Sequence, residues 1–362
     1  MVQAVRFTLF FESETILPTA SSVAPKPWIG TLGGILFVAT LAALVTQLSG
    51  LPAIKTFGVS PLVLGIVTGM LVGNFNHRTI PSSWSKGINL SAKKLLRIAV
   101  AFYGLNISIQ QIIEIGLPGL MLSTVVVLAV LGIGTWVGIN IFRLDRDTAM
   151  LASAGSAICG AAAVLAFEST LRAPAHKSAV AIASVVIFGT LSMFLYPIVI
   201  QTGLLNLDAK AAGMFLGATV HEVAQVVASG SNISPEATEV ATIVKMTRVA
   251  LLVPVLLLLG FWLNQRARRQ GQGKQQSKAP IPWFLIGFLL IALIHSSQVI
   301  PQDALMFMRA VDLFALTMAM TALGIETRFS QLKAAGPKVM GLACSLFMLL
   351  GMGGYFLVRL AS

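Results

Sequence analysis

Charged residues are scarce in this 362-residue chain, where Asp, Glu, Lys and Arg together make up 10%. Soluble domains contain about 25%. Hydrophobic residues make up 56% of the chain. A water-soluble protein of this size needs charged side chains on its surface, whereas a disordered chain is polar and rich in charge. Both classes are therefore excluded, which leaves a membrane protein that crosses the bilayer several times.

Acidic residues and cysteines are also few. The chain has 13 Asp and Glu against 25 Lys and Arg, which gives a net charge of +12. A basic chain can bind nucleic acid, but the apolar runs leave no soluble domain to carry a basic patch, so we expect no nucleic-acid partner. Cys159 and Cys344 lie in apolar segments and form no Cys-x-x-Cys or Cys/His pattern. The sequence therefore indicates neither a metal site nor a cofactor.

Apolar stretches near 20 residues, long enough to cross the hydrocarbon core as a helix, occur about eleven times. Lipid cannot satisfy backbone polar groups, and runs such as 124–134 and 251–260 do not alternate as barrel strands do. The predicted fold class is therefore an all-α polytopic membrane protein. Its predicted spans lie near 29–48, 60–75, 92–106, 117–142, 148–170, 178–202, 211–230, 240–264, 281–299, 304–325 and 335–360.

Eleven spans place the two termini on opposite sides of the membrane, and the basic residues indicate which side is cytoplasmic. With the N-terminus inside, eighteen of the 25 Lys and Arg fall in cytoplasmic segments and five outside, among them Arg172 and Lys177. We expect a cytoplasmic tail over 1–27 and a domain over 28–362 in the bilayer of the inner (cytoplasmic) membrane, with the C-terminus outside. The polar segment 264–280 is typical of a flexible cytoplasmic loop.

A weak internal repeat relates the two halves of the chain. Gly104–Ile107 and Gly324–Thr327 are offset by 220 residues, and each is followed at the same distance by a glycine, Gly116 or Gly336. The predicted topology places the first copy outside and the second inside, which would make the repeat an inverted one. Inverted repeats of this kind are typical of secondary transporters, although amphipathic turns after glycine can also resemble each other by chance.

Three segments look like broken helices, because small and polar residues replace the Leu and Ile of a plain membrane anchor. In the first segment, 152–164, Ser153, Gly155, Ser156 and Gly160 stand among alanines. One interpretation is close helix packing, which small residues allow. The other is an unwound helix whose free N–H groups and half-helix N-terminus bind an anion, with the serine hydroxyls as further donors.

The second segment, 217–230, carries His221, Glu222 and Gln225 in an otherwise apolar span. Ionisable residues at this depth are costly and usually face a cavity or a partner. On a continuous helix His221 and Gln225 share a face, and Glu222 is turned about 100° away. The pattern also resembles the HExxH motif of zinc proteases, but the position of the second histidine ligand is Gln225, so we do not expect a zinc enzyme.

Three more charged residues lie within predicted spans. Asp312 starts the third segment, 312–324, about one turn into its span. Lys245 and Arg248 are three apart on one face of the eighth span. Their side chains can extend to the outer interface, face an anion that suits the guanidinium fork, or pair with Glu222 or Asp312. The sequence leaves these alternatives open.

Four sequence blocks together resemble the YeiH family of bacterial inner-membrane proteins, a family that is also named for sulfate export. The blocks are GSAICGAAAVLA (155–166), VIFGTLSMFLYP (186–197), GATVHEVAQVVA (217–228) and KMTRV (245–249). The resemblance runs from about residue 28 to the end. It implies a transporter-like protein of the cation:proton antiporter and anion-transporter superfamily. It also implies inverted repeats and two discontinuous helices that cross, most simply 148–170 and 304–325.

The favoured interpretation is a secondary transporter rather than an enzyme. It moves a small anion such as sulfate or a sulfonate through the lipid bilayer, coupled to protons. Residues assigned to the anion are Ser153, Gly155, Ser156, Gly160, Lys245 and Arg248. Residues assigned to the proton are His221, Glu222, Gln225 and Asp312. The alternative is a cation/proton antiporter with Glu222 and Asp312 as its carboxylate pair, and either protein could be a homo-oligomer.

Overall fold

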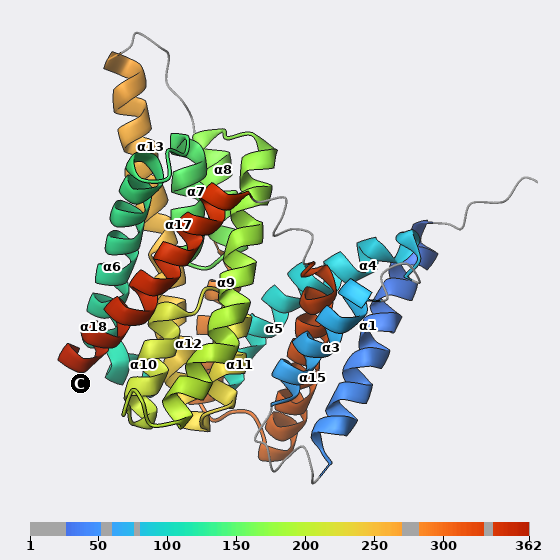
Figure 1. Cartoon of the computed structure of the whole chain (residues 1–362). Helices are drawn as coiled ribbons and strands as arrows, with labels where there is room; N and C mark the ends of the chain where they lie inside the picture. The colour runs from blue at the N-terminus through green and yellow to red at the C-terminus, as the bar shows by residue number, and fades with distance from the viewer. Residues whose placement is uncertain (1–26, 52–59, 76–79, 270–281, 329–335, 362) are drawn as a thin grey trace, which may run out of the picture.

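The computed structural model describes residues 27–51, 60–75, 80–269, 282–328 and 336–361, and within these ranges every regular element is a helix (Figure 1). Short 3₁₀ and π turns join some of them, among them η3 (Ser91–Leu95) and η4 (Tyr103–Asn106). The α-helices are α1 (Pro27–Ser49), α3 (Pro61–Phe75), α4 (Ser85–Leu90), α5 (Leu96–Phe102), α6 (Ile109–Asn140), α7 (Arg146–Ala157), α8 (Ala161–Leu171), α9 (Ala175–Gln201), α10 (Ala209–Thr219), α11 (Val223–Ser231), α12 (Pro235–Ala250), α13 (Leu252–Arg269), α14 (Trp283–Ser296), α15 (Gln302–Glu326), α17 (Pro337–Met348) and α18 (Gly354–Ala361).

The predicted all-helical membrane fold is confirmed for the described residues. Six helices are long and apolar enough to cross a bilayer, and α3, α8 and α14 are shorter apolar helices. The predicted number of about eleven spans is not confirmed. The six long helices are Trp28–Ser49, Ile109–Asn140, Ala175–Gln201, Pro235–Gln265, Gln302–Glu326 and Pro337–Leu360.

The helices form two groups (Figure 1). The smaller group contains α1, α3, α4 and α15; the larger contains α6 to α13 with α17 and α18, and α5 and α14 lie between them. In the smaller group α3 and α15 meet along glycines. A Cβ on Gly69 would lie 3.0 Å from the Cα of Gly324, which leaves no room for a side chain. Small residues thus let the two backbones touch, as in other helix pairs in membranes.

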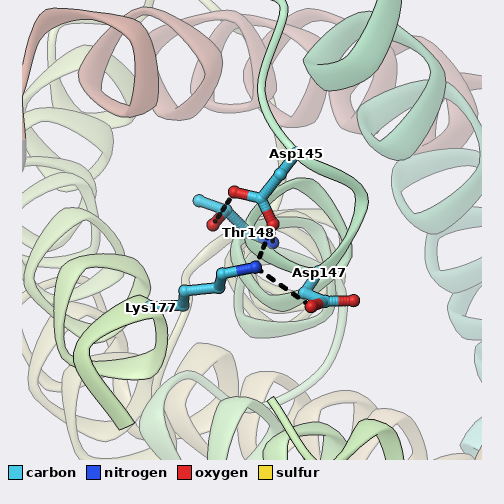
Figure 2. A network of polar contacts seen from close by, with 4 residues as sticks. All are labelled: Asp145, Asp147, Thr148 and Lys177. Carbon is cyan, nitrogen blue, oxygen red and sulfur yellow. Dashed lines mark hydrogen bonds and ion pairs between the residues drawn. The ribbon is translucent and has the colours of Figure 1, made fainter. Parts of the chain in front are cut away.

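The helices α7 and α8 form a hairpin that enters the larger group and returns to the same side. Each has 11 or 12 residues, so each is about 17 Å long and reaches roughly halfway through a 30 Å hydrocarbon core. The Lys177 Nζ, at the start of α9, lies 2.5 Å from Asp145 and 3.0 Å from Asp147, which flank the start of α7 (Figure 2). Because α8 ends just before α9 begins, both ends of this first hairpin lie together.

The helices α10 and α11 form a second hairpin at the opposite end of the same group (Figure 1). The Gln201 Nε2, at the end of α9, donates a 2.5 Å hydrogen bond to the carbonyl of Asn232, just after α11. The Lys210 Nζ, at the start of α10, lies 3.2 Å from Glu114 near the start of α6. The second hairpin therefore begins and ends where α9 ends, and the two hairpins enter from opposite sides.

The hairpins correct three predictions. Segments 148–170 and 211–230 are not crossings, because each turns back at its centre and its two ends bond on one side. The expected crossing pair 148–170 and 304–325 is also wrong, because α15 is a continuous helix over 302–326 and the second broken segment is 209–231. Removing two crossings is removing an even number, which does not change the side on which the chain ends relative to its beginning. Accordingly, α1 begins and α18 ends at opposite ends of the bundle (Figure 1).

Other predictions fall at the edges of the described residues. The tail over 1–27 lies outside them except for its last residue. The predicted loop 264–280 begins later than expected, because α13 continues to Arg269, and its remainder lies outside them. In the predicted repeat, Gly104 lies in η4 and Gly324 near the end of α15, so both copies end a helix. Much of the second copy, 329–335, is outside the described residues, so the repeat stays a prediction.

The ion pairs in Figure 2 predict a pH-dependent stability. Burial raises the pKa of the Asp145 carboxyl, but hydrogen bonds from Lys177 and Thr148 outweigh burial and hold that pKa below its usual value. A lowered pKa stabilises the fold above the unfolded value of about 3.9, and this stabilisation is lost as the pH falls through the folded value. Because Asp145 is half exposed, we expect Lys177→Met to cost less than about 1 kcal/mol at pH 7.

Melting temperatures of the purified protein from pH 7 down to pH 3.5 measure this effect. The difference between wild type and Lys177→Met should shrink as the pH falls below about 4, where the carboxylates become neutral. Lys86→Met removes the same charge from an exposed lysine on α4 and should show no such pH dependence. A difference that stays constant with pH would contradict the ion pairs.

Candidate functional site

The tips of the two hairpins meet in the larger group of helices. In the first hairpin the break covers 158–160, and Gly160 has φ +72°, a conformation that favours glycine. A Cβ on Gly160 would collide with the Glu222 side chain at the tip of the second hairpin. The Ala161 N–H, the first of α8, donates a 3.3 Å hydrogen bond to the Glu222 Oε1. The breaks therefore bring one carboxylate of the second hairpin to the start of α8.

Glu222 also lies at the start of α11, the second helix of the second hairpin. It is the N-cap of α11, with the extended backbone angles φ −112° and ψ 150°, and its N–H donates to the Gln225 Oε1 at 3.3 Å. The first N–H groups of a helix lack partners within the helix and carry its positive dipole end. One buried carboxylate thus lies at the N-terminal ends of both α8 and α11.

The opposite, negative helix ends at the tips are held by two cations of α12. The Arg248 guanidinium bridges the C-terminal ends of α7 and α10, and the Lys245 ammonium donates to the end of α10; both side chains are fully buried. Carbonyls at a helix C-terminus lack partners within the helix, and cations there are favourable. The acceptors of Arg248 are the carbonyls of Ser156 (2.8 Å), Ala157 (2.6 and 3.0 Å), Gly217 (3.1 Å), Ala218 (2.7 Å) and Val220 (3.3 Å), and that of Lys245 is Val220 (2.8 Å).

The charges at the tips do not cancel. Lys245 and Arg248 supply two positive charges, and Glu222 supplies one negative charge when it is ionised. No carboxylate among the described residues forms an ion pair with either cation. Buried charges are screened less than exposed ones. This excess of positive charge therefore favours negative charge at the helix ends at which Glu222 lies.

A cavity of about 500 Å³ opens beside Glu222, between the two groups of helices. Its wall on the hairpin side contains the first residues of α8 and α11, including Ala161 and Val223. The lining also contains Lys93 and Arg97, which lie on η3 and α5, and Glu326 at the end of α15. The remaining lining is mostly apolar and is contributed by α8, α9, α14 and α15.

The four residues predicted to hold an anion in the first hairpin do not line this cavity. Ser153 donates to the carbonyl of Ala149 at 2.7 Å and packs against α6, and Gly155 packs closely against α8 and α9. Ser156 contributes its carbonyl to Arg248. Gly160 is at the tip, where it leaves room for the Glu222 side chain. These small residues shape the first hairpin and bring its tip to the carboxylate.

The residues predicted to couple protons are partly brought together. Glu222 and Gln225 share the start of α11, and Gln225 Nε2 donates to the Thr190 Oγ1 of α9 at 3.3 Å. His221 is fully buried beside them, and its two ring nitrogens have no partner among the described residues. The predicted shared helix face of His221 and Gln225 is wrong, because α10 ends at Thr219 and α11 begins only at Val223.

Asp312 lies in α15 and is not part of the group around Glu222 at the hairpin tips. It is buried in α15, with 4% of its surface exposed, and its Oδ1 has no partner among the described residues. One turn earlier, Arg309 donates to the carbonyl of Leu105 at 2.7 and 3.0 Å, in the first half of α15. Asp312 is not among the residues that line the cavity beside Glu222. The structure therefore does not place the two carboxylates predicted as a pair in one cavity.

Sequence reasoning missed two basic residues that line the cavity, Lys93 and Arg97. From the sequence alone they contribute only to the positive charges that orient the chain. Their spacing of four residues places both on one helix face, and that face borders the cavity. This spacing predicts a shared helix face, but it cannot show that the face borders the same cavity as a hairpin tip.

Comparison with known proteins gives a consistent family. Residues 33–343 match the family model described as conserved hypothetical protein 698. The chain is 60% identical over 344 residues to a UPF0324 membrane protein of Bordetella pertussis, with 95% of this chain and 99% of the relative covered. It is 58% identical over 325 residues to one of Pseudomonas putida (90% and 92% covered) and 37% identical over 327 residues to one of Wolinella succinogenes (90% and 96% covered).

Proposed function

Because the chain belongs to the UPF0324 family of membrane proteins, which is the YeiH family that its sequence resembles, we propose that it acts in the membrane. From the geometry of the site we propose that it is a proton-coupled secondary transporter of small anions. The observation that carries the proposal is the position of Glu222. Its carboxylate lies at the start of α8 and of α11, beside a cavity that Lys93 and Arg97 also line. These are the positions at which helices bind anions.

Protonation of Glu222 controls the site in this proposal. When Glu222 is ionised, its own carboxylate occupies the helix N-termini and repels another anion. When it takes up a proton, the Ala161 N–H and the start of α11 become available to a substrate anion, and Arg97 adds positive charge to the same cavity. Anion and proton therefore bind together, which couples their movement.

Lys245 and Arg248 act through the helix ends rather than by touching the anion. Their donors are directed to backbone carbonyls, so they neutralise the negative ends of α7 and α10 inside the membrane. Without them these carbonyls would be unsatisfied in a medium that offers no water, at a cost of several kcal/mol each. Their charge also raises the positive potential at the tips, as the sequence predicts.

Two hairpins that enter from opposite sides and meet at their tips suit alternating access. A shift of the larger group of helices against the smaller group would move the tips toward one side of the membrane, then the other. For the orientation we propose a cytoplasmic N-terminus. Arg172 and Lys177 lie on the side of α7's start, with Arg143 and Arg146, so this side is even richer in basic residues than the sequence reasoning supposed.

The cation/proton antiporter finds less support in the site. A cation site needs acceptor oxygens, and the carbonyls at the tips accept from Arg248 and Lys245. Asp312, the proposed second carboxylate, does not line the cavity beside Glu222. The anion is therefore the substrate class that the charges at the tips favour.

Flux through reconstituted protein tests the proposal. We expect proteoliposomes to exchange sulfate or short sulfonates faster than protein-free liposomes, and an inwardly directed proton gradient to speed anion uptake. Sodium and potassium fluxes, measured in the same vesicles, should equal those of protein-free liposomes. Anion fluxes at the protein-free level with every sulfur oxyanion and carboxylate tested, or a proton-coupled cation flux, would contradict the proposal.

A further inference from the structure

The cavity is much larger than an inorganic oxyanion. Its volume is about 500 Å³, which lies within the roughly 300–1,000 Å³ of pockets that hold drug-sized ligands. One water molecule occupies about 30 Å³ of liquid, and a tetrahedral oxyanion is only a few times larger. Sulfate at the hairpin tips would therefore leave most of the cavity to other molecules.

The cavity lining combines a few charged residues with many apolar ones. The charged residues are Lys93, Arg97, Glu222 and Glu326. The apolar residues are mostly small or branched. These are Ala92, Leu96, Val100, Leu165, Ala179, Val180, Ile182, Ala183, Val186, Phe284 and Leu323.

Apolar walls disfavour a strongly hydrated anion. An oxygen of sulfate that leaves water must find a donor, or it costs free energy. The backbone N–H groups and Arg97 can meet one head group, but the side chains along α8 and α9 offer no donor. An organic body on the same anion would instead be stabilised there, because its transfer from water to an apolar surface is favourable.

The group that the helix starts already hold indicates which head group fits there. The starts of α8 and α11 hold the carboxylate of Glu222. A carboxylate or sulfonate head can take the same place and still carry an organic body into the apolar part of the lining, whereas sulfate has no such body.

We propose that the cavity binds an organic anion with an apolar body of several carbons, so that sulfate itself is a poor ligand. The oxyanion head lies at the starts of α8 and α11, and the body lies against the apolar lining that α8, α9 and α14 contribute. This inference rests on the proposed function, because it uses the same site, and it names the substrate class.

Binding of a homologous series to the full chain tests the inference. Isothermal titration of protein in nanodiscs, at pH 6, would compare sulfate with linear alkanesulfonates of one to five carbons and with the matching carboxylates. Each methylene buried against the apolar wall should tighten binding by about fourfold, until the cavity is filled. Butylammonium has a similar body and the opposite charge, so it should not bind, and protein-free nanodiscs measure uptake by lipid.

A variant that fills part of the apolar lining of the cavity provides an independent test. Ala183 of α9 is partly exposed and lines the cavity, so Ala183→Leu should remove the gain for the longer sulfonates and leave methanesulfonate binding unchanged. Ala43→Leu adds the same side chain at an exposed position on α1 and should leave the whole series unchanged. Melting temperatures of both variants show whether they fold.

The outcomes separate this inference from the proposed function. Sulfate that binds as tightly as pentanesulfonate, or a series with equal affinity at every chain length, would overturn the organic-anion inference and leave anion transport standing. A normal gain with chain length in folded Ala183→Leu would also overturn it, because the body would then lie elsewhere. Failure of sulfate and of all sulfonates and carboxylates to bind would overturn both proposals.

Discussion

Glu222→Gln should bind anions at least about tenfold more tightly than wild type at pH 8, and should lose the coupling to protons. Glutamine has the shape of the protonated acid and never carries the charge that competes for the starts of α8 and α11. Two negative charges about 4 Å apart repel by several kcal/mol at the effective dielectric of protein sites, so a tenfold change, or 1.4 kcal/mol, is a low estimate.

The pH dependence gives the same test a second readout. In wild type, anion affinity should fall by up to tenfold per pH unit once Glu222 loses its proton, because only the protonated form leaves the helix N-termini free. In Glu222→Gln the affinity should not vary with pH, and anion exchange should persist while a proton gradient no longer drives uptake. Titrations from pH 5 to pH 9 and fluxes in proteoliposomes measure both.

Glu236→Gln is the matched control, since Glu236 lies exposed in the first turn of α12, away from the tips. It removes the same charge and should behave as wild type in both assays. A pH dependence of anion affinity that survives in Glu222→Gln would assign the proton to another group, for example His221, which is buried beside Glu222.

The sequence was sufficient to predict the membrane class and the broken helices. Composition and the length of apolar runs exclude every soluble fold, and they depend on no tertiary contact. Small residues around Gly160 and the polar group at Glu222 marked two segments where a helix is interrupted, and both are interrupted in the structure. The third segment, at Asp312, is a continuous helix, because a buried polar side chain does not by itself break the backbone.

The hairpins could not be predicted from hydropathy. A segment that turns back at its centre has the same length and composition as one that crosses the membrane, and only contacts such as those of Lys177 with Asp145 and Asp147 distinguish them. The role of Arg248 was hidden for a similar reason. Its partners are backbone carbonyls more than 25 residues away in sequence, and backbone groups leave no mark in a residue pattern.

Arg248→Met should produce the largest loss of stability among single substitutions at the hairpin tips. Methionine fills much of the space and donates nothing, so the carbonyls at the ends of α7 and α10 lose their partners in a fully buried place. Each orphaned buried acceptor costs about 1–3 kcal/mol, and removing one partner from a buried charged network typically costs about 3–5 kcal/mol. We expect the free energy of unfolding to fall by about 3–5 kcal/mol.

Denaturant unfolding in detergent, together with the yield of folded protein, measures this loss. Arg248→Lys keeps the charge, but an ammonium has three donors and no planar fork, so it can hold one helix end and not both. Its stability should lie between those of wild type and Arg248→Met. Lys210→Met breaks the exposed ion pair with Glu114 and should cost at most about 1 kcal/mol. A loss in Arg248→Met no larger than that in Lys210→Met would show that the two hairpins do not depend on Arg248. In that case the positive charge would be free to face the anion directly, as one of the alternatives from the sequence supposes.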